Sequence, residues 1–194
     1  MNKKIIVGIT GGIGSGKSTI CNVLDKMGYP VFYSDEVGRS LLKNDQQLKS
    51  EIRAYFGDEV LENGEVVRPK LGAIVFKDKV KLEYLNGLIH PKVRKAFTNW
   101  VDVQNSQILF KESAILFESN DTSCDLVCSV ITNIEERINR VRKRDGANRE
   151  EVLSRINNQM SDAERIHRSN KIIDNNNDQL VIPQILSIIS SIEK

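Results

Sequence analysis

The most informative stretch of this 194-residue chain is Ile5-Ile6-Val7-Gly8-Ile9-Thr10-Gly11-Gly12-Ile13-Gly14-Ser15-Gly16-Lys17-Ser18. Its first part is an apolar run without polar alternation, which is typical of a buried parallel strand. Its second part satisfies the pattern G-x-x-x-x-G-K-S/T of a P-loop. The glycines allow the backbone to turn successive N–H groups toward phosphate oxygens. The stretch therefore predicts a strand, a phosphate-binding loop and the start of a helix, in that order.

The P-loop residues predict a binding site for ATP and Mg²⁺. Lys17 is expected to reach the β- and γ-phosphates, and the Ser18 hydroxyl is expected to bind Mg²⁺. The following helix presents its positive N-terminal end to the same anion. The residues expected to hold the nucleotide here are Gly12, Ile13, Gly14, Ser15, Gly16, Lys17, Ser18 and Thr19.

The surrounding patterns predict an α/β fold. Apolar residues at helical spacing indicate a helix from Thr19 to Met27, and Pro30 to Tyr33 has the pattern of a second short strand. Strand, helix and strand in this order form a βαβ unit, which implies a parallel sheet. Further strands are expected at 107–112, 125–132 and 171–173. The expected fold class is a P-loop NTPase core with a parallel sheet flanked by helices, plus a helical substrate-binding insertion and a helical lid.

We expect a single domain spanning 1–194 with three parts. The core comprises about 1–44, 106–133 and 166–194, the insertion about 45–105 and the lid about 134–165. The lid follows from two helical patterns, Ile134 to Lys143 and Arg149 to Met160, and an amphipathic helix is expected after Asp178. Within the insertion, His90-Pro91 is expected to separate two helices, because the residue before proline avoids helical geometry. Asn63-Gly64 predicts a turn or small hairpin.

Composition limits the classes of partner. The net charge of +2 gives no electrostatic reason to expect nucleic acid or an anionic membrane surface. No stretch approaches the ~20 apolar residues of a membrane span, and the apolar run at the N-terminus is too short for a signal peptide. Three cysteines in a chain of this size are expected to be free thiols in the cytoplasm, and a zinc site at Cys124 and Cys128 lacks nearby histidines. We expect a monomer or a weak homo-oligomer.

Asp35 and Arg39 are candidates for the chemistry. Asp35 follows the second strand, and ligands bind at the carboxyl edge of a parallel sheet. A carboxylate there is able to accept the proton of an attacking hydroxyl or to help hold Mg²⁺. Arg39 is four residues on and shares its face if a helix has begun. The alternative is a helix-capping Asp with a surface arginine, and local sequence does not separate the two.

A basic cluster from Arg137 to Arg149 offers further candidates. Arg137, Arg140 and Arg144 lie at i, i+3 and i+7, which places them on one helical face. Planar guanidinium groups stabilise the charge that develops in phosphoryl transfer, although a solvated helix face is the usual reason for such a run. A GTPase switch is disfavoured, because the spacing in Asn170-Lys171-Ile172-Ile173-Asp174 is one residue longer than the guanine-reading pattern.

The ordered motifs resemble the dephospho-CoA kinase family over nearly the whole chain. They are the stretch from Gly8 to Thr19, Ser34-Asp35 with Arg39, Ile89-His90-Pro91, Ala114-Ile115-Leu116-Phe117-Glu118, Arg140 with Arg144-Asp145, and Ile173-Asp174-Asn175-Asn176. Two departures are that the family often has Asp-Ala-Asp at Tyr33-Ser34-Asp35, and usually proline at Ala114.

The resemblance implies that ATP phosphorylates the ribose 3′-hydroxyl of dephospho-CoA to give CoA and ADP, the final step of coenzyme A synthesis. It implies that Asp35 is the base, that Arg39 places the substrate, and that Arg140 and Arg144 are lid arginines around the phosphates. Asn175 and Asn176 would lie beside the adenine. The alternatives are a kinase of the nucleoside-monophosphate type and a nucleotide-sensing protein without an acceptor.

Overall fold

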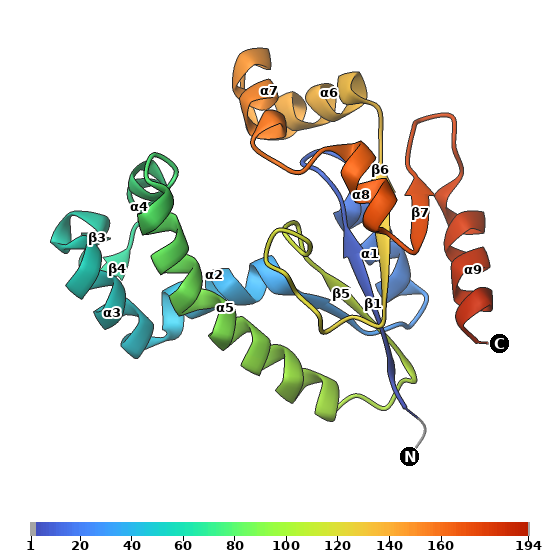
Figure 1. Ribbon diagram of the computed structural model, residues 1–194, viewed down its shortest axis with the longest axis horizontal. Helices are drawn as coiled ribbons and strands as arrows, with labels where there is room; N and C mark the ends of the chain where they lie inside the picture. Colours follow the sequence, from blue (N-terminus) through green and yellow to red (C-terminus); the bar gives the residue numbers. More distant parts are fainter. Residues whose placement is uncertain (1–2, 194) are drawn as a thin grey trace. The chain divides into compact units, whose positions relative to one another are not determined.

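The computed structural model describes residues 3–193. Residues 1, 2 and 194, which the sequence interpretation assigns to the core, lie outside the described residues. The chain forms two compact units: one joins the part up to Phe32 with the part from Gln104 onward, and the other is Tyr33–Val103. Figure 1 follows the order of the elements along the chain.

A five-stranded sheet forms the centre of the first unit, and its order is β2-β5-β1-β6-β7. The strands are β1 (Ile5–Thr10), β2 (Val31–Tyr33), β5 (Ile108–Glu112), β6 (Leu126–Ile131) and β7 (Lys171–Asp174). β1 runs parallel to β5 and β6, and β6 runs parallel to β7. In this register Ile9 lies between Glu112 and Cys128. The predictions of a parallel sheet and of its strands are confirmed, and the P-loop follows the central strand.

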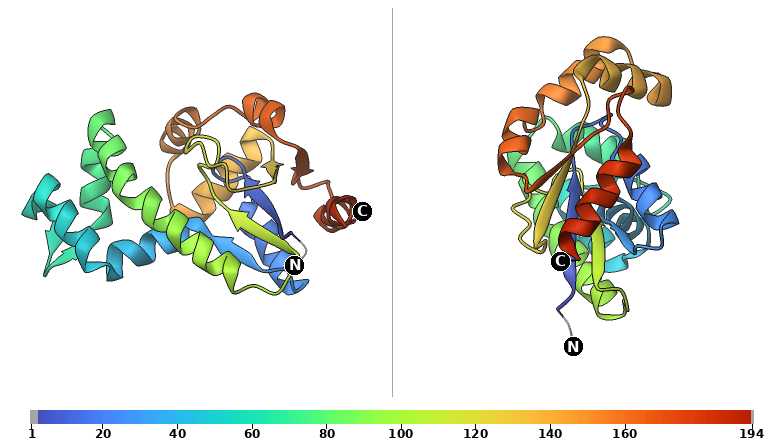
Figure 2. Two further views of the ribbon diagram at one scale, coloured as in Figure 1. Left: turned by 60° about the horizontal axis from the view of Figure 1, so that its bottom comes forward. Right: turned by 90° about the vertical axis from the view of Figure 1, so that its right-hand side faces the viewer.

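Helices cover both faces of this sheet. α1 (Lys17–Lys26) and α9 (Val181–Ile192) pack together on one face, and α8 (Asp162–Arg168) lies on the other, as the right-hand view of Figure 2 shows. The sequence predicted α1 and the closing helix α9. It did not predict α8, whose seven residues are too few for a clear apolar period.

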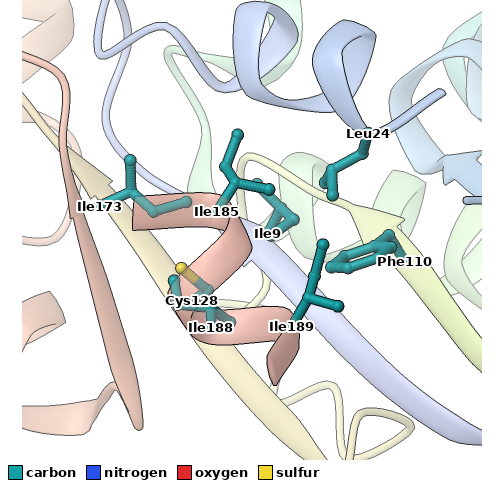
Figure 3. A pocket seen from close by; sticks show the side chains of 8 residues that line it. All are labelled: Ile9, Leu24, Phe110, Cys128, Ile173, Ile185, Ile188 and Ile189. Carbon is teal, nitrogen blue, oxygen red and sulfur yellow. The ribbon is translucent and has the colours of Figure 1, made fainter. Parts of the chain in front are cut away.

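The packing of α9 on the sheet forms an apolar core. Ile185, Ile188 and Ile189 of α9 point toward Ile9, Cys128 and other side chains of the strands (Figure 3). All three isoleucines are buried, whereas Leu186 on the outer face of α9 is 47% exposed. The apolar side chains of α9 therefore pack the C-terminal helix against β1, the strand that leads into the P-loop.

Truncation of Ile185 to alanine is expected to lower the free energy of unfolding by about 2–5 kcal/mol, because it leaves a cavity in this packed interface. Urea unfolding measures the change. The matched control is Leu186→Ala on the exposed face of the same helix, which should change stability by less than about 1 kcal/mol. Equal losses for the two variants would contradict the assigned face of α9.

Two capped helices form a hairpin in the first unit. They are α6 (Ile134–Asp145) and α7 (Arg149–Asn157). Asn133 caps α6 by accepting from Glu136 N, and Gly146 ends it with a φ of 69°. The sequence pattern ended this helix at Lys143, but α6 continues through Asp145, because only Gly146 takes the left-handed conformation. Ile138, Val141 and Val152 are the buried core between the helices.

The second unit, Tyr33–Val103, is mostly helical. Its helices are α2 (Ser34–Asn44), α3 (Gln46–Phe56), α4 (Arg68–Val75) and α5 (Lys79–Asp102), with a short 3-10 helix η1 (Asp58–Val60). α2 packs against α5, so this unit begins before the sequence-based boundary near residue 45. β3 (Leu61–Glu62) and β4 (Glu65–Val66) form a hairpin, which confirms the small hairpin predicted from Asn63-Gly64. Both turn residues have positive φ, 50° and 80°.

The prediction that His90-Pro91 separates two helices is wrong, since α5 is continuous through Pro91. Proline removes the hydrogen bond to the carbonyl of Gly87, four residues earlier in the helix. Leu85 and Phe97, on either side of Pro91, are both buried, so packing favours one helix over a break. Although α5 has 24 residues, no helix within residues 3–193 has the length and hydrophobicity needed to cross a membrane.

Candidate active site

The P-loop connects the carboxyl end of β1 to α1, and its shape requires glycine. Gly11, Gly14 and Gly16 have φ values of 153°, 77° and 93°, which residues with a Cβ rarely adopt. A Cβ at Gly12 would overlap the guanidinium of Arg137, and a Cβ at Gly16 would overlap the side-chain amide of Asn175. The loop is therefore held against side chains from outside it at two of its glycines.

The loop has the features of an anion site. The Lys17 ammonium donates to the carbonyls of Gly11 at 2.7 Å and Gly12 at 3.4 Å, so it bends back over the loop. α1 begins at Lys17, and its N-cap residue, Gly16, has no side chain that could cap the helix. The buried Ser15 hydroxyl has no hydrogen-bond partner among the described residues. Uncapped amides, an ammonium and an orphaned hydroxyl together suit a bound phosphate.

Arg137 holds the P-loop in place by a hydrogen bond to its backbone, a role that sequence reasoning missed. The pattern placed it on one face with Arg140 and Arg144, but its side chain is buried, with 3% of the residue exposed. Its Nε donates to the Ile13 carbonyl at 2.9 Å, and its Nη1 donates to Asp162 at 2.7 Å. Burial lowers the pKa of Arg137 from its usual value, while Asp162 opposes that shift. Helical spacing finds the face on which Arg137 lies but not its depth.

Arg140 and Arg144 lie in different surroundings. Arg140 donates to Glu136, to Asn177 and, at 2.8 Å, to the carbonyl of Asn175. Arg144 is 62% exposed and pairs with its neighbour Asp145 at 2.7 Å. The structure thus brings Arg140 to the loop after β7, whereas Arg144 lies on the surface of α6. A phosphate contact by either arginine stays a prediction.

Asn175 and Asn176 are both engaged in the first unit. The Asn175 Nδ2 donates to the Ser15 carbonyl of the P-loop at 2.8 Å. The Asn176 Nδ2 donates to Asp174 at 2.6 Å, and its Oδ1 accepts from the backbone N–H of Asn133 at 2.8 Å. The loop after β7 is therefore tied to the P-loop and to the start of α6. A contact of these asparagines with adenine stays a prediction.

Asp35 and Arg39 belong to the second unit. β2 ends at Tyr33, and Asp35 lies in the first turn of α2, where the helix dipole stabilises a negative charge. Arg39 follows four residues later in the same helix, as the sequence interpretation required. Both side chains are exposed, and neither forms an ion pair within residues 3–193.

Glu112 is a second residue that sequence reasoning missed. It ends β5, the strand next to β1, and only 7% of it is exposed. Burial is the main cause that raises the pKa of Cys21, followed by the charge of Glu112, with Lys17 acting in the opposite direction. β5, the strand that carries Glu112, packs against α1. The available signal was an acid at the end of a buried strand, which is where P-loop NTPases carry their Walker-B acid.

The three cysteines are free thiols. Burial raises the pKa of Cys124 to about 11 and that of Cys128 to about 12, so both are protonated at neutral pH. Within residues 3–193, no three His, Cys, Asp or Glu side chains come together as metal ligands. The thiols therefore do not contribute a nucleophile or a thiolate ligand to this site.

Comparisons with known proteins identify the family of this chain. The family model described as dephospho-CoA kinase matches residues 5–180. The chain belongs to the dephospho-CoA kinase family. A dephospho-CoA kinase of Bacteroides fragilis is 37% identical over 96% of this chain and 92% of its own length. One of Fusobacterium nucleatum is 38% identical over 89% and 90%, respectively.

A solved structure supports the same fold. A protein of Thermus thermophilus has a TM-score of 0.89 and 31% identity, covering 98% of each chain. The dephospho-CoA kinase from Campylobacter jejuni has a TM-score of 0.68 at 24% identity, covering 96% of each chain, and this likeness shows the fold alone.

The signature segment of the dephospho-CoA kinase family around Glu118 has a structural role in this chain. Arg165 is almost fully buried and donates to Glu118 at 2.9 Å. The same guanidinium contacts Asp162, which also pairs with Arg137. Glu118, Arg165, Asp162 and Arg137 thus form an ionic network of two buried arginines and two partly exposed acids, which ends at the P-loop carbonyl of Ile13. Loss of either acid would remove a partner of a buried guanidinium, which makes such a network costly to break.

Proposed function

We propose that this chain is an ATP-dependent kinase that phosphorylates the ribose 3′-hydroxyl of dephospho-CoA and releases CoA and ADP. The observation that carries the proposal is the glycine-rich loop that leads into the uncapped N-terminus of α1, with the Lys17 ammonium bent back over it. The chain that contains this loop belongs to the dephospho-CoA kinase family. Phosphoryl transfer needs positioning and charge stabilisation more than covalent chemistry, and this loop supplies both for a triphosphate.

The roles proposed for the site residues rest on the P-loop motif and on the resemblance to the dephospho-CoA kinase family. The amides of the P-loop and the Lys17 ammonium bind the β- and γ-phosphates, and Asp35 accepts the proton of the ribose hydroxyl. Arg39 places the acceptor. Ser18 and Asp35 are the proposed ligands of Mg²⁺, and both offer the exposed oxygen atoms that this ion prefers. Mg²⁺, when bound, neutralises charge on the phosphate oxygens.

The remaining parts of the chain have proposed roles as well. The helical unit Tyr33–Val103 provides the binding surface for dephospho-CoA, and the hairpin of α6 and α7 serves as the lid. A lid excludes water and so protects ATP from hydrolysis. Arg140 and Arg144 are the proposed lid arginines, and Asn175 and Asn176 are proposed to lie near the adenine. The free thiols suit a reducing compartment, so we propose the cytoplasm as its location.

Acceptor-dependent release of ADP tests this function. In a coupled assay with ATP and Mg²⁺, we expect dephospho-CoA to stimulate ADP formation, and AMP, CMP, shikimate and gluconate to remain near the rate without acceptor. Stimulation by AMP or CMP instead would assign a nucleoside-monophosphate kinase. Tight ATP binding without any acceptor-dependent ADP would assign a nucleotide-sensing protein.

A further inference from the structure

The carbonyl of Ser15, inside the P-loop, is held by three side chains from outside the loop. Its oxygen accepts from Thr132 Oγ1 at 2.9 Å and Asn175 Nδ2 at 2.8 Å, and more weakly from Arg140 Nη1 at 3.5 Å. A carbonyl oxygen has two lone pairs, so the two short bonds already saturate it. We call Thr132 and Asn175 the carbonyl clamp.

We propose that the carbonyl clamp orients the Ser15–Gly16 peptide so that the N–H of Gly16 is presented to a nucleotide phosphate. Thr132 and Asn175 are then positioning residues for phosphate binding. The inference rests on the proposed nucleotide site and deepens it, because it assigns Thr132 a role and moves the main role of Asn175 from the adenine to the P-loop backbone.

The planarity of the peptide bond links the two sides of the loop. In a trans peptide the C=O of one residue and the N–H of the next point in opposite directions. Fixing the Ser15 oxygen on the side of Thr132 and Asn175 therefore turns the Gly16 N–H to the other side of the plane. Gly16 has a φ of 93°, and the Asn175 amide occupies the place that a Cβ would take. Glycine at 16 and asparagine at 175 thus fit the same peptide orientation.

The same arrangement recurs two residues earlier in the loop. The Ile13 carbonyl accepts from Arg137 Nε at 2.9 Å, which turns the N–H of Gly14 away from Arg137. Alternate peptides of the P-loop are thus held by side chains from outside the loop, of which Thr132 and Arg137 are buried. A nest of N–H groups binds anions well when its orientation is fixed before the ligand arrives, because no ordering entropy remains to be lost.

Thr132 is the member of the clamp best suited to a test. It follows β6 directly and is 4% exposed, so water has little access to replace its hydroxyl. Its Oγ1 also lies 2.8 Å from the Ile131 carbonyl and 3.2 Å from that of Asn175. A hydroxyl has only one proton to donate, so these acceptors compete for it. If the Thr132 hydroxyl only stabilises the end of β6, its loss lowers the Tm alone. If it orients the P-loop, its loss also lowers the affinity for phosphate ligands.

The experiment compares Thr132→Val, which keeps the shape but removes the hydroxyl, with Thr132→Ser, which keeps the hydroxyl. Isothermal titration calorimetry measures Kd for ADP and, by displacement of ADP, for tripolyphosphate, which carries no base. We expect Thr132→Val to weaken both ligands about tenfold, the cost of about one hydrogen bond, and Thr132→Ser to stay within about twofold of the original chain.

The matched control is Ser129→Ala, which removes another buried hydroxyl of β6 that bonds to Ser169 at 2.6 Å and not to the P-loop. It should bind both ligands like the original chain. If Thr132→Val also binds both ligands normally while its Tm falls, the hydroxyl is structural and the clamp is overturned. The assay needs no acceptor, so it is independent of whether dephospho-CoA is the substrate.

A second variant, Asn175→Ala, keeps the test decisive if Thr132→Val does not fold. Loss of affinity for ADP and tripolyphosphate by the same factor supports the clamp. Loss for ADP alone overturns it, since that result assigns Asn175 to the base. Because both residues act on one oxygen, the double variant should lose less than the product of the two single effects.

Discussion

Replacement of Lys17 by alanine is expected to weaken ATP binding and to lower kcat/KM for phosphoryl transfer by ~10²–10³. The Lys17 ammonium lies over the loop on the carbonyls of Gly11 and Gly12, which is the position from which it is proposed to meet the β- and γ-phosphates. The variant removes the one lysine of the motif while the glycine geometry stays. Calorimetry with ATP and the coupled ADP assay measure the two effects.

The control for this variant is Lys26→Ala at the far end of the same helix, α1. It removes the same side chain and should leave both ATP affinity and turnover within about twofold, because a single exposed surface charge contributes little. An unchanged rate in Lys17→Ala would exclude the P-loop assignment.

Asp35→Asn is expected to lower kcat by ~10²–10⁴ while ATP affinity is retained. Asparagine keeps the size of the side chain but cannot accept the proton of the attacking hydroxyl. A loss in kcat without a change in ATP affinity would show that the Asp35 carboxylate acts in the phosphoryl-transfer step and not in nucleotide binding. Single-turnover measurements with dephospho-CoA separate this step from product release.

Glu36→Gln is the matched control, since Glu36 is the other acid in the first turn of α2 and is also exposed. Both variants lose one favourable interaction with the helix dipole, of about 0.3–1 kcal/mol, so their Tm values should fall together. Only Asp35→Asn should lose activity. Wild-type turnover in that variant would remove Asp35 from the role of base.

The contrast between α5 and the P-loop shows where sequence reasoning reaches its limit. The P-loop from Gly11 to Ser18 was predicted correctly because its shape depends on residue types at fixed positions within one short segment. Pro91 was misinterpreted because a local preference opposes a helix there, while burial of Leu85 and Phe97 on both sides favours one. Burial of side chains from distant residues is not a local property, so no local pattern gives its strength.

The sequence alone determined the parallel sheet, the P-loop with Lys17, and the helix that carries Arg137, Arg140 and Arg144, because these depend on periodicity and short-range motifs. Only the tertiary structure decided that Arg137 is buried against Ile13, that Glu112 is buried at the end of β5, and that Thr132 and Asn175 meet on the Ser15 carbonyl. Thr132 and Asn175 lie more than a hundred residues from Ser15 in the chain, at the ends of neighbouring strands. The order of strands in the sheet brings them together, and that order is set by packing and not by any one segment.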